Sequence, residues 1–76
     1  MNMKITVKLF ASFRDNRFKI SEQEQSDGTD CRKIMLDLGI TEKEMGIVLI
    51  NGRHVSLDQV LIDGDTLAMF PLVGGG

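Results

Sequence analysis

The sequence predicts an α+β fold, with one main helix packed across one face of a mixed sheet of roughly four to five strands. Alternating apolar and polar residues near the N-terminus and apolar runs in the C-terminal half are typical of strands. Apolar residues at helical spacing occur once, in the middle of the chain. With 76 residues and no internal repeat, the chain has the length of one small domain.

Composition and charge exclude several classes of function. The formal net charge of −2 provides no basic surface for nucleic acid. No apolar run approaches a membrane span, and the first residues lack the core of a signal peptide. We therefore expect no nucleic-acid partner, no membrane partner and a cytoplasmic location. A single cysteine, Cys31, excludes an internal disulfide and fits a reducing compartment.

The N-terminal third predicts a hairpin. Residues 3–11 alternate as a half-buried strand, and its apolar face consists of Met3, Ile5, Val7 and Leu9. Residues 12–16 are expected to form a turn and residues 17–20 a short second strand. Residues 21–28 are polar throughout, so we expect a solvated loop there.

The central helix is predicted from its cap and its apolar spacing. Thr29 or Asp30 can act as the N-cap, and Gly39 is expected to end the helix after about three turns. The helical face that covers the sheet is formed by Cys31, Ile34, Met35 and Leu38. Residues 41–46 then predict a second cap or a single helical turn.

Two turns organise the C-terminal half. Asn51-Gly52 predicts a hairpin between strands at residues 47–50 and 53–55, because both central residues of the favoured turn need positive φ. After an irregular stretch over residues 56–61, Asp63-Gly64-Asp65 predicts a tight turn.

The final strand is predicted over residues 66–73. If it lies beside the first strand, in the middle of the sheet, the two most apolar segments share one core. The domain is therefore expected to span residues 1–73, followed by a flexible glycine tail over residues 74–76.

Several polar or reactive side chains are assigned structural roles. His54 is expected to be an exposed residue beside a turn, and no set of residues at ligand spacing predicts a metal site. Cys31, on the apolar side of the helix, is expected to be a small buried hydrophobe. The carboxylates of Asp63 and Asp65 are explained by turn chemistry.

Strand parity points to a second apolar surface. If the first strand directs its apolar residues towards the helix, a further set points away from it: Phe10, Leu49, Ala68, Phe70 and Leu72. Such a patch on a small domain is typical of a partner site. In the alternative, Phe10 and Phe70 turn inward at the strand ends and close the core.

The end of the sequence, Gly74-Gly75-Gly76, has no side chains to bury. It can be a frayed end or a cloning remnant. The alternative is a slim carboxyl terminus that enters a narrow channel in another protein.

Three segments together resemble the ThiS/MoaD family of ubiquitin-like sulfur carriers. They are Lys-Ile-Thr-Val-Lys-Leu-Phe-Ala at residues 4–11, Gly-Ile-Val-Leu-Ile-Asn-Gly-Arg at residues 46–53, and Leu-Ile-Asp-Gly-Asp-Thr-Leu-Ala-Met-Phe-Pro-Leu-Val-Gly-Gly-Gly at residues 61–76. The residues before the glycines are most similar to the small subunit of molybdopterin synthase. The family pattern needs two terminal glycines, so Gly74 only lengthens the tail.

The resemblance implies a β-grasp, ubiquitin-like fold and a carrier that is not itself an enzyme. It implies that an E1-like adenylyltransferase uses ATP to adenylate the carboxylate of Gly76, which then becomes a thiocarboxylate, with Gly75 beside it in the channel. No cofactor is bound permanently. The second expected partner is the large subunit of molybdopterin synthase or an equivalent sulfur acceptor, and the resemblance favours the interface role of the apolar patch.

Three other functions stay open. The carrier can supply sulfur to the thiamine thiazole or to another metabolite. A ubiquitin-like protein modifier shares the activation step but ends as a conjugate on target lysines. A plain binding module needs no terminal glycines at all.

Overall fold

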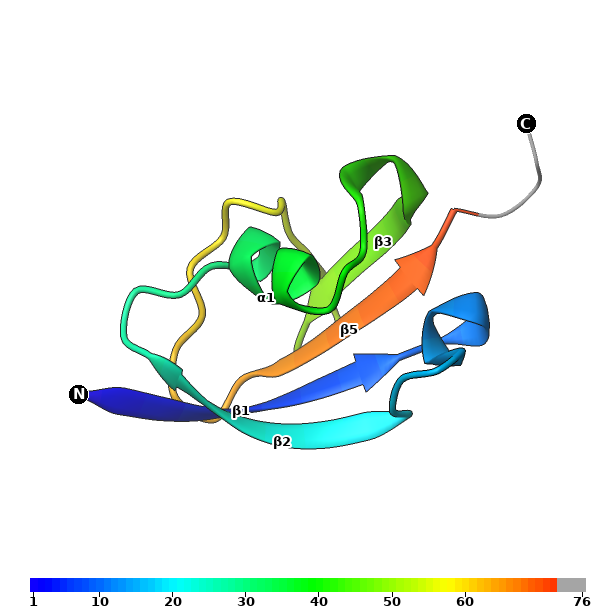
Figure 1. The fold of residues 1–76 in the computed structure, drawn as a ribbon. Coiled ribbons are helices and arrows are strands. Elements are labelled where there is room, and N and C mark those ends of the chain that lie inside the picture. The colour runs from blue at the N-terminus through cyan, green and yellow to red at the C-terminus, as the bar shows by residue number, and fades with distance from the viewer. Residues whose placement is uncertain (73–76) are drawn as a thin grey trace.

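The structure, a computed structural model, describes residues 1–72 of the chain and forms a five-stranded mixed sheet with one α-helix (Figure 1). The sheet order is β2-β1-β5-β3-β4. The elements in chain order are β1 (Asn2–Leu9), the 3-10 helix η1 (Ala11–Arg14), β2 (Ile20–Ser26), α1 (Cys31–Asp37), the 3-10 helix η2 (Glu42–Glu44), β3 (Met45–Ile50), β4 (Arg53–His54) and β5 (Thr66–Pro71). The predicted domain boundary after residue 73 and the glycine tail lie outside the described residues.

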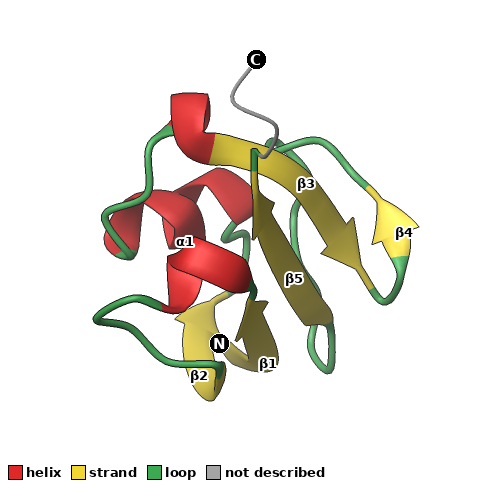
Figure 2. Cartoon of the chain, turned by 90° about the vertical axis from the view of Figure 1, so that its right-hand side faces the viewer, coloured by secondary structure: helices red, strands yellow, loops and turns green. Residues whose placement is uncertain are grey.

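The final strand lies beside the first strand, the arrangement in which the two most apolar segments share one core. β5 lies parallel to β1 and antiparallel to β3, so it occupies the middle of the sheet. Inward-facing residues of β1 and β5 are fully buried under α1, which covers one face of the sheet (Figure 2). The core contains Met3, Ile5, Val7, Leu9, Phe13, Cys31, Ile34, Met35, Ile40, Val48, Ile50, Leu61, Leu67 and Met69.

Helix α1 begins and ends at the predicted signals but is shorter than expected. The carboxylate of Asp30 accepts a hydrogen bond from the backbone N–H of Lys33 (2.9 Å), which makes Asp30 the N-cap. At the other end, Gly39 takes φ +76° and the N–H of Ile40 donates to the carbonyl of Met35. This closing turn already includes Leu38, so α1 has seven residues, about two turns.

The predicted second strand and loop are wrong. Residues 17–20 are not a strand except for Ile20, and the expected loop is instead the edge strand β2, antiparallel to β1 over its whole length. Ser21, Gln23 and Gln25 alternate with more exposed neighbours. Backbone pairing with β1, rather than burial of apolar side chains, makes this segment a strand, and hydrophobic periodicity cannot detect such a strand.

The turns of the C-terminal half are confirmed. Asn51 and Gly52 both have positive φ (51° and 83°) between β3 and β4. Asp65 is buried, and its carboxylate accepts hydrogen bonds from the N–H of Ile62 and from the side-chain amide of Asn51 (both 2.9 Å). Asp63 accepts one from the N–H of Lys4 (2.7 Å). These carboxylates therefore fasten the turn to its neighbours, as turn chemistry predicts.

The 3-10 helix η1 overlaps the turn expected at residues 12–16, and the 3-10 helix η2 lies within residues 41–46, where a cap or a single helical turn is expected. Within residues 1–72, no helix has the length and apolar character needed to cross a bilayer.

Candidate docking surface

The sheet face that points away from α1 carries a group of apolar side chains, with Lys8 beside Ala68 on the same face. Cross-strand pairs place Leu49 beside Ala68 and Ile47 beside Phe70, and paired residues project from the same side of a sheet. The alternate residues of β5, Leu67 and Met69, are fully buried on the other side. We call the surface formed by Phe10, Ile47, Leu49, Ala68 and Phe70 the open face.

Two aromatic rings form the centre of the open face. The rings of Phe10 and Phe70 stack with centroids 4.2 Å apart and an interplanar angle of 8°. Arg14 lies over the Phe10 ring, with its Cζ 5.2 Å from the ring centroid, a distance at which a cation and a ring attract each other. Neither phenylalanine belongs to the buried core. The structure thus has the arrangement in which both rings point away from α1.

Backbone contacts hold Phe10 in this position. Its N–H donates to the carbonyl of Met69 (3.2 Å) across the β1–β5 pair. Ala11 then turns the chain into η1 with φ +51°, a conformation that costs about 1 kcal/mol for a residue with a side chain. The side chain of Arg14 is fixed as well, because its Nε donates to the carbonyl of Leu9 (2.7 Å).

Sequence reasoning missed two members of this region. Ile47 has the same strand parity as Leu49 and is 43% exposed, so parity could have found it. Arg14 lies in a 3-10 helix, where no periodic pattern reports the side-chain direction. Its position over Phe10 appears only in three dimensions.

The other predicted site residues lie at or beyond the end of β5. Leu72 is exposed, but it follows the last residue of β5, so strand parity does not place it on the open face. Its N–H donates to the carbonyl of Glu44 (2.8 Å). Gly74, Gly75 and Gly76 lie outside the described residues, and their expected roles stay predictions.

The remaining polar candidates lie apart from the open face or serve the fold. Cys31 has no exposed surface, and burial, followed by the charges of Asp30 and Asp65, raises the pKa of its thiol to about 11. The thiol is therefore protonated at neutral pH and is part of the core. His54 is exposed, as predicted. Within residues 1–72, no three His, Cys, Asp or Glu side chains are grouped as a metal site.

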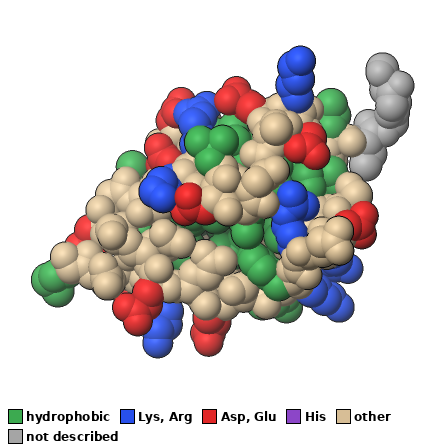
Figure 3. All heavy atoms as spheres, viewed as in Figure 1, with side chains coloured by type: hydrophobic (Ala, Val, Ile, Leu, Met, Phe, Trp, Pro, Cys, Tyr) green, Lys and Arg blue, Asp and Glu red, His purple; other side chains and the backbone are tan. Residues whose placement is uncertain are grey.

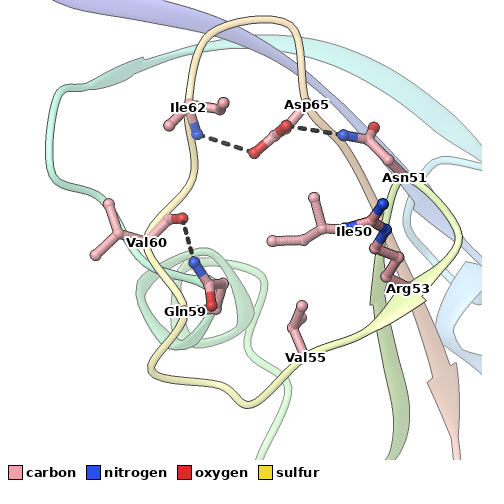
Figure 4. Close-up of a pocket in the computed structure, with 8 residues that line it drawn as sticks. All are labelled: Ile50, Asn51, Arg53, Val55, Gln59, Val60, Ile62 and Asp65. Carbon is pink, nitrogen blue, oxygen red and sulfur yellow. Dashed lines mark hydrogen bonds between the residues drawn. The ribbon is translucent and has the colours of Figure 1, made fainter.

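A shallow pocket lies between the β3–β4 hairpin and the segment before β5 (Figure 4). Its volume is about 470 Å³, and it is lined by Ile50, Asn51, Arg53, Val55, Gln59, Val60, Ile62 and Asp65. Within the lining, Asp65 is hydrogen-bonded to Asn51 and Ile62, so its carboxylate is used by the fold. The pocket adjoins the start of β5, whereas Phe70 and Leu72 lie at the other end.

Acidic and basic side chains are mixed over the surface seen in Figure 3, without a large area of one sign. This mixture agrees with the net charge of −2. The face seen in Figure 3 therefore provides no strong electrostatic field of one sign.

The family of the chain is decided by its match to known proteins. The model of the ThiS family matches residues 7–76. The chain belongs to the ThiS family. This confirms the resemblance drawn from the sequence, and the match extends through the three glycines. Members of this family are small carrier proteins rather than catalysts.

Solved structures agree with this assignment. A Pyrococcus furiosus protein described as a candidate molybdopterin converting factor, subunit 1, is 29% identical, with a TM-score of 0.76 and coverage of 93% of this chain and 99% of that one. The Haloferax volcanii small archaeal modifier protein 1 is 20% identical, with a TM-score of 0.74 and coverage of 93% and 99%.

The complex of subunits 1 and 2 of molybdopterin-converting factor from Helicobacter pylori includes a chain that is 22% identical, with a TM-score of 0.67 and coverage of 97% and 100%. A comparison with curated protein sequences finds no match. The ThiS-family chain thus has the ubiquitin-like β-grasp fold, as the resemblance implied.

Proposed function

We propose that this ThiS-family protein is a sulfur carrier whose reactive group is the carboxylate of Gly76. The observation that carries the proposal is the family match, which extends through the glycines to residue 76. The open face supports it, because a carrier must present its terminus to other proteins and needs a surface with which to dock.

In the proposed chemistry, the carboxylate becomes a thiocarboxylate in two steps. A carboxylate oxygen of Gly76 attacks the α-phosphorus of ATP, and pyrophosphate leaves. A hydrosulfide equivalent from a sulfur donor then attacks the acyl carbon of the adenylate; AMP leaves with the former carboxylate oxygen, and one proton is released. The product is a thiocarboxylate, a nucleophile that transfers its sulfur to an acceptor. Hydrolysis of the resulting acyl–sulfur bond returns the carboxylate.

The chain itself supplies shape rather than acid, base or metal. Gly74, Gly75 and Gly76 have no side chains that would obstruct a narrow channel. Pro71, at the end of β5, restricts the backbone before the glycines. The stacked rings of Phe10 and Phe70 offer a rigid contact at the same end of β5. ATP is used by the activating partner and is not a resident cofactor.

For the acceptor, we propose molybdopterin biosynthesis, with this protein as the small subunit of molybdopterin synthase. The similarity at 29% identity to the Pyrococcus furiosus protein supports this choice. The chain in the Helicobacter pylori complex shares only its fold with this protein, and the presence of two subunits in that complex supports a large-subunit partner. An E1-like adenylyltransferase is the second partner, and a cytoplasmic location follows from ATP-dependent activation.

Intact-mass spectrometry tests the proposal. The protein is incubated with a cognate E1-like enzyme, ATP and a sulfide donor. The expected mass corresponds to one oxygen replaced by sulfur. A variant that lacks Gly75 and Gly76 serves as the control and should keep its mass. An unchanged mass for the full chain, under conditions that charge a related carrier, would refute the proposal.

A ubiquitin-like modifier is the alternative that a specific observation favours. The TM-score to the small archaeal modifier protein 1, 0.74, lies between those to the two converting-factor chains, 0.76 and 0.67. A modifier leaves conjugates on target lysines through an isopeptide bond to Gly76, and a pure carrier leaves none. Mass spectrometry of lysine-linked glycine remnants from cells separates the modifier from the carrier. If the acceptor is the thiamine thiazole or another metabolite, labelled sulfur from the carrier would appear in that compound.

A further inference from the structure

The point at which the chain leaves the sheet is built around a glycine. We propose that Gly46 is a positioning residue, which lets the Pro71–Leu72 peptide lie against β3 and thereby sets where residues 73–76 begin relative to the open face. The inference rests on the proposed function, because the position of this exit matters only if the terminus reacts. Nothing in the sulfur chemistry itself singles out this residue.

Space, and not backbone conformation, requires glycine at position 46. An ideal Cβ placed on Gly46 would lie 2.7 Å from the carbonyl oxygen of Pro71 and 2.9 Å from the nitrogen of Leu72. Cβ atoms are essentially never found closer than 3.0 Å to such atoms. Both contacts are backbone atoms, which cannot rotate away as a side chain can. Any other residue would therefore push the Pro71–Leu72 peptide away from β3.

Gly46 is the extra residue of a β-bulge. Met45 pairs with Pro71 and Ile47 pairs with Phe70, so two steps along β3 correspond to one step along β5. A bulge bends a strand and changes the direction of the backbone beside it. Next to the bulge, the N–H of Leu72 still finds an acceptor, the carbonyl of Glu44, at 2.8 Å. This hydrogen bond fastens the chain beyond the last residue of β5.

The acceptor is itself held in place by η2. One carboxylate oxygen of Glu44 accepts hydrogen bonds from the backbone N–H and from the hydroxyl of Thr41, both at 2.9 Å. Both bonds lower the pKa of the Glu44 carboxyl below its ordinary value, and the bond from the backbone N–H has the larger effect. We call the group formed by Thr41, Glu44 and Gly46 the exit seat. Leu72 is hydrogen-bonded to it through the carbonyl of Glu44.

The exit seat and the open face separate two tasks of the carrier. The open face governs how tightly the body docks on the activating enzyme. The exit seat sets where the chain leaves the sheet at Leu72, which is the point from which the terminus must reach the active site, and a misplacement of reacting groups by about 1 Å can reduce a reaction rate by about 100-fold. A change in the seat should therefore lower kcat and leave KM almost unchanged.

Gly46→Ala tests the inference. Hydrogen exchange should show the amide of Leu72 losing about tenfold in protection, because its hydrogen bond to Glu44 is stretched. With the E1-like enzyme and ATP, kcat for thiocarboxylation should fall about tenfold or more while KM changes by less than about twofold. Wild-type kcat, or a Leu72 amide that stays protected, would overturn the inference.

Gly28→Ala is the matched control for a general loss of stability. Gly28 has φ +92° with nothing within 4 Å of an added Cβ, so alanine introduces strain without a clash. The N–H of its neighbour Asp27 donates to the carbonyl of Met1, at the opposite end of β1 from Phe10. This variant should melt at a lower temperature and keep the wild-type kcat. An equal fall in kcat for both variants would show that stability alone matters, against the inference.

A second variant covers the case in which Gly46→Ala does not fold. Glu44→Ala removes an exposed carboxylate and the bonds to Thr41, so it loosens the exit seat without a clash. We expect kcat and the hydrogen-exchange protection of the Leu72 amide each to fall about threefold. If both stay at their wild-type values, the inference is overturned. A wild-type protein that is never charged would contradict the proposed function instead, and the exchange of the Leu72 amide would still test whether Gly46 sets the path of the Pro71–Leu72 peptide.

Discussion

The two faces of the sheet use the same strands but differ in what their apolar residues do. Leu67 and Met69 of β5 are fully buried beneath α1. Their neighbours Ala68 and Phe70 lie on the open face and stay partly exposed. In a domain of 76 residues, one covered face supplies the core, and apolar residues on the other face are typical of a partner site. We therefore propose that alternate residues of one strand serve stability and recognition.

The largest expected effect comes from emptying the covered face. Leu67→Ala removes a side chain with no exposed surface, and we expect a loss of about 3 kcal/mol in the free energy of unfolding. Because small domains have only about 5–15 kcal/mol in total, the melting temperature should fall steeply. Urea denaturation measures the change. A loss as small as that of an open-face variant would contradict the division between faces.

The sequence predicted this division well because β1 alternates apolar and polar residues, and strand parity assigns successive residues of β5 to opposite faces. Parity placed Phe10, Leu49, Ala68 and Phe70 together, but it left open whether the rings turn inward. That choice depends on the parallel pairing of β1 with β5 and on the turn at Ala11, which are tertiary features. The contact between Gly46 and Pro71 also joins residues far apart in the chain.

The edge strand β2 could not be predicted for a different reason. Its side chains are Ser, Glu and Gln after Ile20, so apolar periodicity is absent. Residues 17–20 have a more strand-like apolar pattern than β2, yet Arg17 and Phe18 make contacts with the rest of the domain. The Nε of Arg17 donates to the carbonyl of Leu38 (2.9 Å), and Phe18 packs against the core. Local pattern thus misplaced the strand by several residues.

An intermediate effect is expected from the thiol on the covered face. The folded chain holds the proton of Cys31 up to a pKa of about 11, compared with 9.0 for an ordinary thiol. Stability should therefore be unaffected below pH 9.0 and fall as the pH rises towards about 11, by at most about 1.4 kcal/mol per pH unit. Urea titrations at several pH values, with Cys31→Ala as the control, measure this slope.

The burial of Cys31 also predicts that its thiol reacts more slowly in the folded protein than in the unfolded chain. At pH 8, folded Cys31 should carry about 100-fold less thiolate than a free cysteine. Alkylation by iodoacetamide should therefore wait for unfolding and accelerate in urea. Rapid alkylation of the folded protein would contradict the burial of this face.

A change on the open face is expected to have the smallest effect on the free energy of unfolding. Its effect on partner binding should be larger than its effect on stability. Phe70→Ala removes the stack with Phe10, which contributes about 1 kcal/mol. Affinity for the E1-like enzyme should fall by about tenfold or more, as is typical of an aromatic anchor at an interface. Calorimetry measures both quantities. Leu36→Ala, on the exposed side of α1, is the control and should bind normally.

The most direct test of this division of tasks is a map of the partner's contact on the two faces. Protein labelled with ¹⁵N is titrated with the E1-like enzyme or with the large subunit, and amide signals are followed by nuclear magnetic resonance. The largest changes should occur at Phe10, Ile47, Leu49, Ala68 and Phe70, with α1 unchanged around Leu36. Changes concentrated on α1, with the open face unaffected, would contradict the account.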